Sequence, residues 1–255
     1  MNVGVVGLGM VGNAIKDGFE YLKHKVLEHD IKLNTQLSDI IDTDIVFICV
    51  STPPQEDGSC DVSIVETIIT DLSKLKYNGV ICIKSTVEPG TTRRLINTHP
   101  TLTITHVPEF LREAHAYFDF TSGHNVLVVG TDSQEAYDVI VKTHGEFPKN
   151  SVMMKPQEAE LVKYYSNVYK ATRITFANSF ARVCNHLDVD YTKVKDTFLL
   201  HGVTESEYLN VTDSFGAFGG SCLPKDVTAF NNLIQKHNID VNLFTTIIGE
   251  NEKYK

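Results

Sequence analysis

The sequence lacks the features that mark metal-binding, disulfide-linked, membrane-spanning and nucleic-acid-binding proteins. Its five cysteines form no CxxC pair and its ten histidines show no ligand-like spacing, so we expect no metal site and reduced thiols, as in the cytoplasm. No cluster of lysine and arginine is longer than a pair and the net charge is -9, which argues against a nucleic-acid or membrane-surface partner. No apolar run approaches spanning length and no basic leader precedes the first strand, so neither a membrane helix nor a signal peptide is expected.

The first half of the sequence contains short β-rich runs that alternate with amphipathic stretches. The chain of 255 residues, 42% of them hydrophobic, is long enough for two ordinary domains. The candidate strands span Val3 to Val6, Lys25 to Glu28, Asp44 to Val50, Val80 to Lys84, Thr103 to Val107 and Val126 to Val129. The runs DIVFICV and GVICIK are apolar nearly throughout, as in parallel strands covered on both faces, which places Cys49 and Cys82 in the core. We therefore predict an α/β fold with a Rossmann-like doubly wound sheet over residues 1–153.

From Pro156 onward the strand signal disappears and helical spacing takes over. Apolar residues recur at helical intervals over residues 157–187, which predicts one long helix, and shorter helices are predicted over Thr192 to Leu199 and Lys225 to His237. These helices would form an all-α domain over residues 154–255. Because the apolar residues between Glu158 and Leu187 are spread too evenly for one small domain to bury, we expect a homodimer built on the long helix.

The first strand runs directly into the glycine motif GLGMVG, which begins at Gly7. Placed between a strand and an amphipathic helix, Gly7, Gly9 and Gly12 predict a dinucleotide site in which backbone amides meet the phosphates, with an ordinary tight turn as the alternative. Asp30 ends the next strand, where a carboxylate accepts hydrogen bonds from the ribose hydroxyls and repels a 2'-phosphate. NAD is therefore expected in preference to NADP, a preference that the nearby Lys32 weakens slightly.

Two segments rich in hydroxyl groups, VSTPP from Val50 and KSTVEPGTT from Lys84, fall at the carboxyl ends of predicted strands. Ligands bind at these ends in open α/β sheets. Hydroxyls such as those of Thr52 and Thr86 are therefore candidates for lining a nicotinamide pocket. Taken alone, such Ser/Thr/Pro clusters are more often simple turns.

Two sets of polar side chains have spacings that suit acid/base and oxyanion chemistry. Glu109 and Glu113 are four residues apart, which on a helical turn places both carboxylates on one side, either in a desolvated cleft or on a solvated face. Glu160, Lys163 and Asn167 share one stripe of the long helix. Such stripes are usually surface, but Lys163 and Asn167 together could donate hydrogen bonds to an oxyanion.

The sharpest chemical signal is the segment FGGSCLPKD around Cys222. This cysteine follows two glycines and precedes a helix that could begin at Pro224, a favoured first helical residue. A thiol near a helix N-terminus and beside Lys225 is expected to be nucleophilic, and Asp226 lies one turn further on. The alternative is a buried structural cysteine, the interpretation that suits Cys184 inside the long helix.

In their order along the chain, GLGMVG, VSTPP, KSTVEPGTT, VPEFLREA, ELVKYYSN and FGGSCLPKD resemble the motifs of the UDP-glucose and GDP-mannose dehydrogenase family. The resemblance covers essentially the whole chain. It implies that NAD serves two successive oxidations of a nucleotide-sugar C6 alcohol, UDP-glucose to UDP-glucuronate above all, through a cysteine thiohemiacetal and thioester. A 3-hydroxyacid or 6-phosphogluconate-type dehydrogenase, which needs no cysteine nucleophile, and a non-catalytic cofactor-binding remnant are the alternatives.

The resemblance also implies roles for individual residues. The implied nucleophile, oxyanion donors and residues that hold the hydrolytic water are Cys222, Lys163, Asn167, Asp226, Glu109 and Thr86. The implied cofactor contacts are Gly7, Gly9, Met10, Val11, Gly12, Asp30, Lys32, Thr52, Thr86 and Glu113. The implied contacts to the nucleotide sugar are Phe110, Leu111, Lys163, Asn167, Gly219 and Lys225.

The sequence departs from the family pattern in three places. The loop DSFGAFGG lacks the proline that the family usually carries, which implies an altered sugar pocket. The segment TESEYLN shows no counterpart of an arginine that the family commonly has, which affects phosphate or partner contacts. The chain ends at GENEKYK, about where the family's connecting helix begins. We therefore expect the C-terminal nucleotide-base domain to be missing and UDP-glucose to be turned over poorly.

Overall fold

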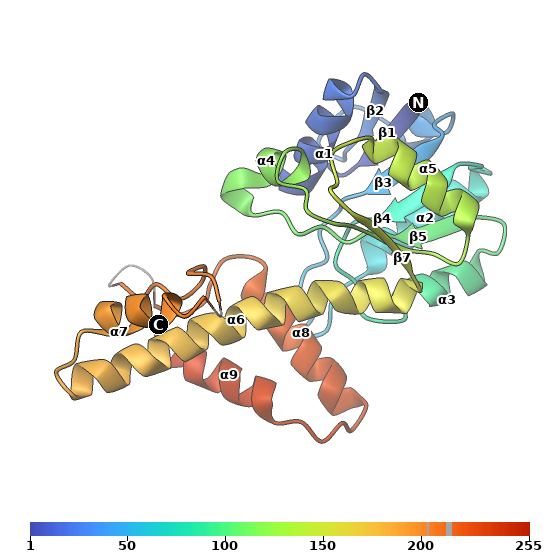
Figure 1. Cartoon of the computed structure of the whole chain (residues 1–255). Coiled ribbons are helices and arrows are strands. Elements are labelled where there is room, and N and C mark those ends of the chain that lie inside the picture. The colour runs from blue at the N-terminus through green and yellow to red at the C-terminus, as the bar shows by residue number, and fades with distance from the viewer. Residues whose placement is uncertain (203, 213–215) are drawn as a thin grey trace. The chain divides into compact units, whose positions relative to one another are not determined.

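The structure is a computed structural model that describes residues 1–202, 204–212 and 216–255. It divides into two compact units. Unit 1 comprises Met1–Gln55 and Cys60–Lys163, and unit 2 comprises Glu56–Ser59 and Tyr164–Lys255. The helix α6, Pro156–His186, is one long helix (Figure 1). Its residues up to Lys163 belong to unit 1 and the remainder to unit 2.

Unit 1 is built on a seven-stranded sheet in the order β2-β1-β3-β4-β5-β6-β7 (Figure 1). Its strands are β1 Asn2–Val6, β2 Lys25–His29, β3 Ile45–Ile48, β4 Val80–Ile83, β5 Thr103–His106, β6 Leu127–Gly130 and β7 Ser151–Met154. Neighbouring strands are parallel except β5 and β6. The predicted α/β fold is confirmed. The sequence reasoning missed β7, a strand of four residues with none of its side chains fully buried.

Helices cover both faces of this sheet. They are α1 Met10–Tyr21, α2 Ser63–Lys74, α3 Thr91–Thr98, α4 Ala116–Phe120 and α5 Gln134–His144, with the short 3-10 helices η1 Leu37–Ile40 and η2 Glu113–His115. On one face Val5 and Phe47 pack with Phe19 of α1. On the other face Ile48 packs with Ile69 of α2. Burial on both faces explains why the strand sequences are apolar nearly throughout.

Unit 2 is helical, as predicted. Besides its part of α6 it contains α7 Tyr191–Leu199, α8 Leu223–Lys236 and α9 Leu243–Glu252. Val168 of α6, Val227 of α8 and Ile247 of α9 share one buried cluster. The predicted helices over 157–187, 192–199 and 225–237 match α6, α7 and α8 within two residues, whereas α9 was not predicted. The first three residues of the loop DSFGAFGG, 213–215, lie outside the described residues.

Candidate active site

A cavity of about 610 Å³ opens in unit 1 where β1, β2 and β3 end, lined by residues that include Gly7, Gly9 and Asp30. Gly7 has a φ of +88°, and a Cβ on Gly12 would lie 1.9 Å from the carbonyl oxygen of Gly7. Only glycine fits so close an approach between strand and helix. Met10 and Val11 begin α1, and no side chain caps the amides of its first turn. This geometry fits the phosphates of a dinucleotide.

Asp30 is held rigidly at this cavity. Its Oδ2 accepts a hydrogen bond from the Leu8 amide at 2.6 Å, and its Oδ1 accepts one from the Lys32 amide at 2.8 Å. These two amides, Leu8 first and then Lys32, lower the pKa of Asp30. The carboxylate is therefore ionised and oriented where the sequence predicted a ribose contact, and Lys32 also lines the cavity.

Asp30→Asn is expected to remove most of the preference for NAD over NADP. The aspartate places a fixed negative charge where a 2'-phosphate would lie, and asparagine removes the repulsion while keeping a hydrogen-bonding group. Titration of each variant with both cofactors measures the ratio of affinities, expected to fall by on the order of tenfold. Asp71→Asn is the matched control, because Asp71 lines the same cavity from α2. Equal affinity of the unchanged chain for both cofactors would contradict the prediction.

The two hydroxyl-rich segments are bound to each other. Thr52 Oγ1 donates to the carbonyl oxygen of Thr86 at 2.8 Å, and Ser85 Oγ donates to that of Val50 at 2.7 Å. Thr52 is buried and Thr86 half-buried. The structure thus brings together two segments that the sequence could only place at strand ends. The Thr52 hydroxyl is engaged in holding the backbone at Thr86.

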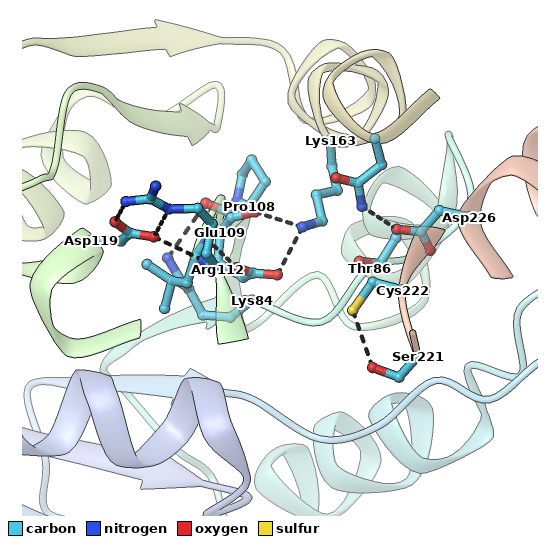
Figure 2. Close-up of polar contacts among 12 residues, drawn as sticks. Lys84, Thr86, Pro108, Glu109, Arg112, Asp119, Lys163, Ser221, Cys222 and Asp226 are labelled. Carbon is cyan, nitrogen blue, oxygen red and sulfur yellow. Dashed lines mark hydrogen bonds and ion pairs between the residues drawn. The ribbon is translucent and has the colours of Figure 1, made fainter. Parts of the chain in front are cut away.

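A buried ion pair joins α6 to the segment after β5. Lys163 Nζ donates to Glu109 Oε1 and to the Glu109 carbonyl oxygen, both at 2.8 Å, as Figure 2 shows. The two side chains are only 6% and 11% exposed. Burial by itself raises the pKa of Glu109, but the Lys163 ammonium, the Leu111 amide and Lys84 outweigh it and hold this pKa below its usual value. Glu109 is therefore a carboxylate at neutral pH.

Three further residues of unit 1 lie around this pair. Lys163 Nζ lies 6.0 Å from the centroid of the Phe110 ring, and the Leu111 amide donates to Glu109 Oε2 at 2.7 Å. Lys84, which the sequence reasoning did not single out, is buried and donates to the Pro108 carbonyl oxygen at 3.5 Å. Burial lowers its pKa. The sequence did contain a signal for this residue, because Lys84 is a charged side chain at the end of an otherwise apolar predicted strand.

Glu109 and Glu113 do not share a helical turn, the condition under which the sequence would place both carboxylates on one side. Residues 107–112 are not helical, and the Glu109 side chain accepts the Leu111 amide within this segment. Glu113 begins η2 and is exposed. Its neighbour Arg112 pairs with Asp119 at 2.6 Å. The contact of Glu113 with the cofactor stays a prediction.

Unit 2 presents Cys222 at the start of a helix. Cys222 is the N-cap residue of α8, its side chain is exposed, and its Sγ lies 3.5 Å from Ser221 Oγ. Pro224 stands in the first turn, as its position in the sequence suggested. Cys184 and Cys82 are buried and Cys49 is half-buried. Cys222 is thus the one exposed thiol among the five cysteines, all of which lie within the described residues.

One turn into α8, Asp226 is almost completely buried. Its Oδ2 accepts from Asn167 Nδ2 at 2.6 Å, and its Oδ1 accepts from Lys225 Nζ at 2.6 Å. Asn167 is 3% exposed, so this part of the predicted polar stripe faces the interior and not solvent. The sequence placed both residues in the site but did not predict that they bond to each other.

The glycines before Cys222 are exposed, and Gly220 has a φ of +75°. The segment is anchored at Phe218, whose amide donates to Asn251 Oδ1 at 2.7 Å and whose carbonyl accepts from Asn251 Nδ2 at 3.0 Å. The sequence reasoning missed Asn251, a buried amide on α9. A Cβ built on Gly219 would have no neighbouring atom within 4 Å, which leaves room for the predicted approach of a ligand.

Within the described ranges, no group of three or more His, Cys, Asp or Glu side chains is arranged to hold a metal ion. In the same part of the chain, no helix has the length and apolar character needed to cross a membrane.

The fold and these side chains define a dinucleotide-binding α/β protein with a helical second unit that carries an exposed thiol. Residues 20–147 match the NAD binding domain of the UDP-glucose/GDP-mannose dehydrogenase family, and residues 157–253 match its central domain. The chain belongs to this family.

The sequence is 31% identical over 242 residues to a UDP-glucose 6-dehydrogenase of Rickettsia prowazekii, a match that covers 91% of this chain and 55% of the relative. The chain thus spans about half the length of the curated relatives it matches. The structure of a UDP-glucose dehydrogenase from Pyrobaculum islandicum superposes with a TM-score of 0.89 at 28% identity, covering 99% of this chain and 68% of that one. A 3-hydroxyisobutyrate dehydrogenase from Mycobacterium tuberculosis, at 12% identity with a TM-score of 0.76, covers 99% of this chain and 93% of that one, and shares the fold alone.

Proposed function

We propose that this chain carries the chemistry of an NAD-dependent UDP-glucose 6-dehydrogenase, which oxidises the C6 alcohol of the nucleotide sugar to a carboxylate in two steps. The observation that carries the proposal is the exposed thiol of Cys222 at the N-terminus of α8, in the same unit as the buried Asn167 and Asp226 pair. The relatives from Rickettsia prowazekii and Pyrobaculum islandicum bear the name of this enzyme. The five free cysteines support a cytoplasmic location.

Cys222 would form and break one covalent bond in the cycle. Bound NAD would supply the acceptor for the two electrons that each oxidation removes from C6. Between the two oxidations, Cys222 Sγ adds to the aldehyde carbon and the aldehyde oxygen takes up a proton, giving a thiohemiacetal. After the second oxidation the adduct is a thioester. Water then adds to its carbonyl carbon, the C–S bond breaks, the carboxylate leaves and the thiol regains its proton.

The remaining side chains have chemistry suited to these steps. Lys163 and Asn167 carry N–H donors that can stabilise the oxyanion formed when sulfur or water adds to the carbonyl. Asp226 and Glu109 are carboxylates with acceptor capacity left after the hydrogen bonds described above. Together with Thr86 they would position the hydrolytic water, and one of the two carboxylates would take its proton.

The ratio of NADH formed to sugar acid formed tests the proposal. The cysteine route requires two NADH for each acid, because the same carbon is oxidised twice. The 3-hydroxyacid alternative, which needs no cysteine, gives one NADH for each substrate. Two NADH with UDP-glucose would support the proposal, whereas one NADH or no reduction of NAD would contradict it.

We also propose that the chain forms a homodimer through α6. An exposed apolar stripe runs along this helix at spacings of three, four and seven residues and ends just past its last residue; it comprises Tyr165, Tyr169, Phe176, Phe180, Val183 and Leu187. Phe176 is 59% exposed and Tyr165 is 78% exposed. Contiguous exposed apolar surface of this kind marks an interface more often than a free face.

Phe176→Asp combined with Phe180→Asp is expected to shift the chain from dimer to monomer. Two carboxylates in an apolar interface would be desolvated without partners, which strongly disfavours association. Light scattering at micromolar concentration measures the mass, expected to fall from two chains to one. Phe198→Asp is the control, because Phe198 is 46% exposed on α7, outside the stripe. A monomeric mass for the unchanged chain would refute the proposed dimer.

A further inference from the structure

Helix α3 is capped by a side chain from a distant helix. Its N-cap residue is Gly90, which has a φ of +100° and no side chain to cap the first turn. Glu160 of α6 takes this role, with Oε2 accepting from the Gly90 amide at 2.5 Å and Oε1 accepting from the Thr92 amide at 2.7 Å. The Glu160 side chain is fully buried.

A buried carboxylate is a costly way to cap a helix of eight residues. A serine or aspartate at the N-cap position would satisfy the same amides at the surface. Burial raises the pKa of Glu160, and the hydrogen bonds from Thr92 and Gly90 offset this only in part. The arrangement differs from a local cap in one respect: it joins two segments that are 68 and 70 residues apart in sequence.

Both joined segments carry residues of the candidate site. Thr86 lies four residues before Gly90, and its carbonyl oxygen is held by the Thr52 hydroxyl. Lys163 lies one turn after Glu160 on the same stripe of α6 and holds Glu109. The segment from Thr86 to Thr92 is thus fixed near both of its ends. Glu160, which holds its second end, lies one helical turn from Lys163.

We propose that Glu160 is a positioning residue: its carboxylate fixes the Thr86 segment relative to Lys163 and so sets the geometry of the oxidation site. This proposal rests on the proposed function, because the chemical roles of Thr86 and Lys163 come from it. Glu160 acts through its contacts with Gly90 and Thr92 and has no direct part in the chemical steps proposed above.

Glu160→Gln tests the proposal with little change in volume. An amide in place of the carboxylate leaves one acceptor oxygen for two backbone N–H groups, so one of the two contacts is lost. Turnover with UDP-glucose is expected to fall by about tenfold to a hundredfold, since small misplacements cost that much. The apparent affinity for NAD is expected to change much less than turnover, because neither Glu160 nor Thr86 lines the cavity at Gly7 and Asp30. Glu160→Asp keeps the charge but has a shorter side chain. Its turnover is expected to lie between that of Glu160→Gln and that of the unchanged chain.

Glu158→Gln is the matched control. Glu158 is an exposed carboxylate on the same helix, and it accepts only the Lys155 amide, at 2.8 Å, where α6 begins. This variant removes the charge of a first-turn carboxylate but can keep its single contact through the remaining amide oxygen, and it does not touch the Thr86 segment. Its turnover is expected to equal that of the unchanged chain.

Amide hydrogen exchange at Gly90 and Thr92 gives a readout that does not depend on activity. In Glu160→Gln, exchange is expected to be at least about tenfold faster at whichever of the two amides loses its contact, since a lost hydrogen bond to a charged group weakens protection by more than a factor of ten. In Glu158→Gln, exchange at both amides is expected to be unchanged. Unchanged exchange, or faster exchange with unchanged turnover, would overturn the proposal. An unchanged chain that does not turn over UDP-glucose would contradict the proposed function instead, and exchange alone would then decide whether Glu160 anchors the segment.

Discussion

Replacing Cys222 by serine is expected to abolish formation of the sugar acid while NAD binding stays intact. A serine hydroxyl has no appreciable ionised fraction at neutral pH, whereas a thiol at a helix N-terminus can react as the thiolate. Removal of a covalent nucleophile costs on the order of a thousandfold or more in turnover. Cys222 is exposed and is the N-cap residue of α8, so the change of one atom leaves the packing unchanged.

Mass spectrometry of the sugar products and the yield of NADH measure this effect together. Ser221→Ala is the control, because the Ser221 hydroxyl is the polar neighbour of the thiol at 3.5 Å and is also exposed. It is expected to keep acid formation. Acid production by Cys222→Ser at the rate of the unchanged chain would rule out the covalent route.

Lys163→Met is expected to cost both turnover and stability. It removes the partner of Glu109, whose side chain is only 11% exposed. Breaking a buried ion pair from one side leaves an uncompensated charge and typically costs about 3–5 kcal/mol in the free energy of unfolding. Turnover is expected to fall as well, because the proposed oxyanion donor is lost and Glu109 is no longer held.

The stability loss in Lys163→Met should depend on pH. The pKa of Glu109 lies below its ordinary value of 4.5 in the folded chain. The stability that its partners supply is therefore fully present above pH 4.5 and is lost as the pH falls through the folded pKa. In the variant the carboxyl can take up a proton instead of staying charged and unpaired. The difference in the free energy of unfolding between the unchanged chain and Lys163→Met should therefore be largest near neutral pH and smaller at acid pH.

Urea unfolding at pH 7 and at acid pH measures this difference in the free energy of unfolding. Lys155→Met is the control, because Lys155 is exposed just before α6 begins. Adding Glu109→Gln to Lys163→Met is expected to recover most of the lost stability at pH 7, because no buried charge is left unpaired. A loss of equal size at every pH would show that the ion pair is not its cause.

Most elements of the fold, though not β7 and α9, could be predicted from the sequence because their signals are local. Strands buried on both faces are apolar nearly throughout, and the 31 residues of α6 repeat apolar side chains at helical spacing. The backbone at Glu109 carries no such local signal. The interval of four residues between Glu109 and Glu113 is compatible with a helix, and only the structure shows that residues 107–112 are not helical.

The candidate site could be predicted residue by residue but not as a set of contacts. Lys163 and Glu109 are 54 residues apart, and Asn167 and Asp226 are 59 apart, so no local pattern pairs them. Glu160 shared a polar stripe that resembled a surface face until the structure showed it buried. Buried polar side chains form hydrogen bonds with partners that only the tertiary structure brings close. A sequence motif identifies the polar residue but not its partner.

Intact mass of the chain after incubation with UDP-glucose and NAD tests most directly whether the chemistry runs through Cys222. An adduct of the mass of the bound sugar nucleotide is expected in the unchanged chain after an acid quench, located by peptide mapping to Cys222 and absent in Cys222→Ser. Formation of sugar acid with no adduct at any time of quenching, or an adduct that persists in Cys222→Ser, would contradict the proposed route.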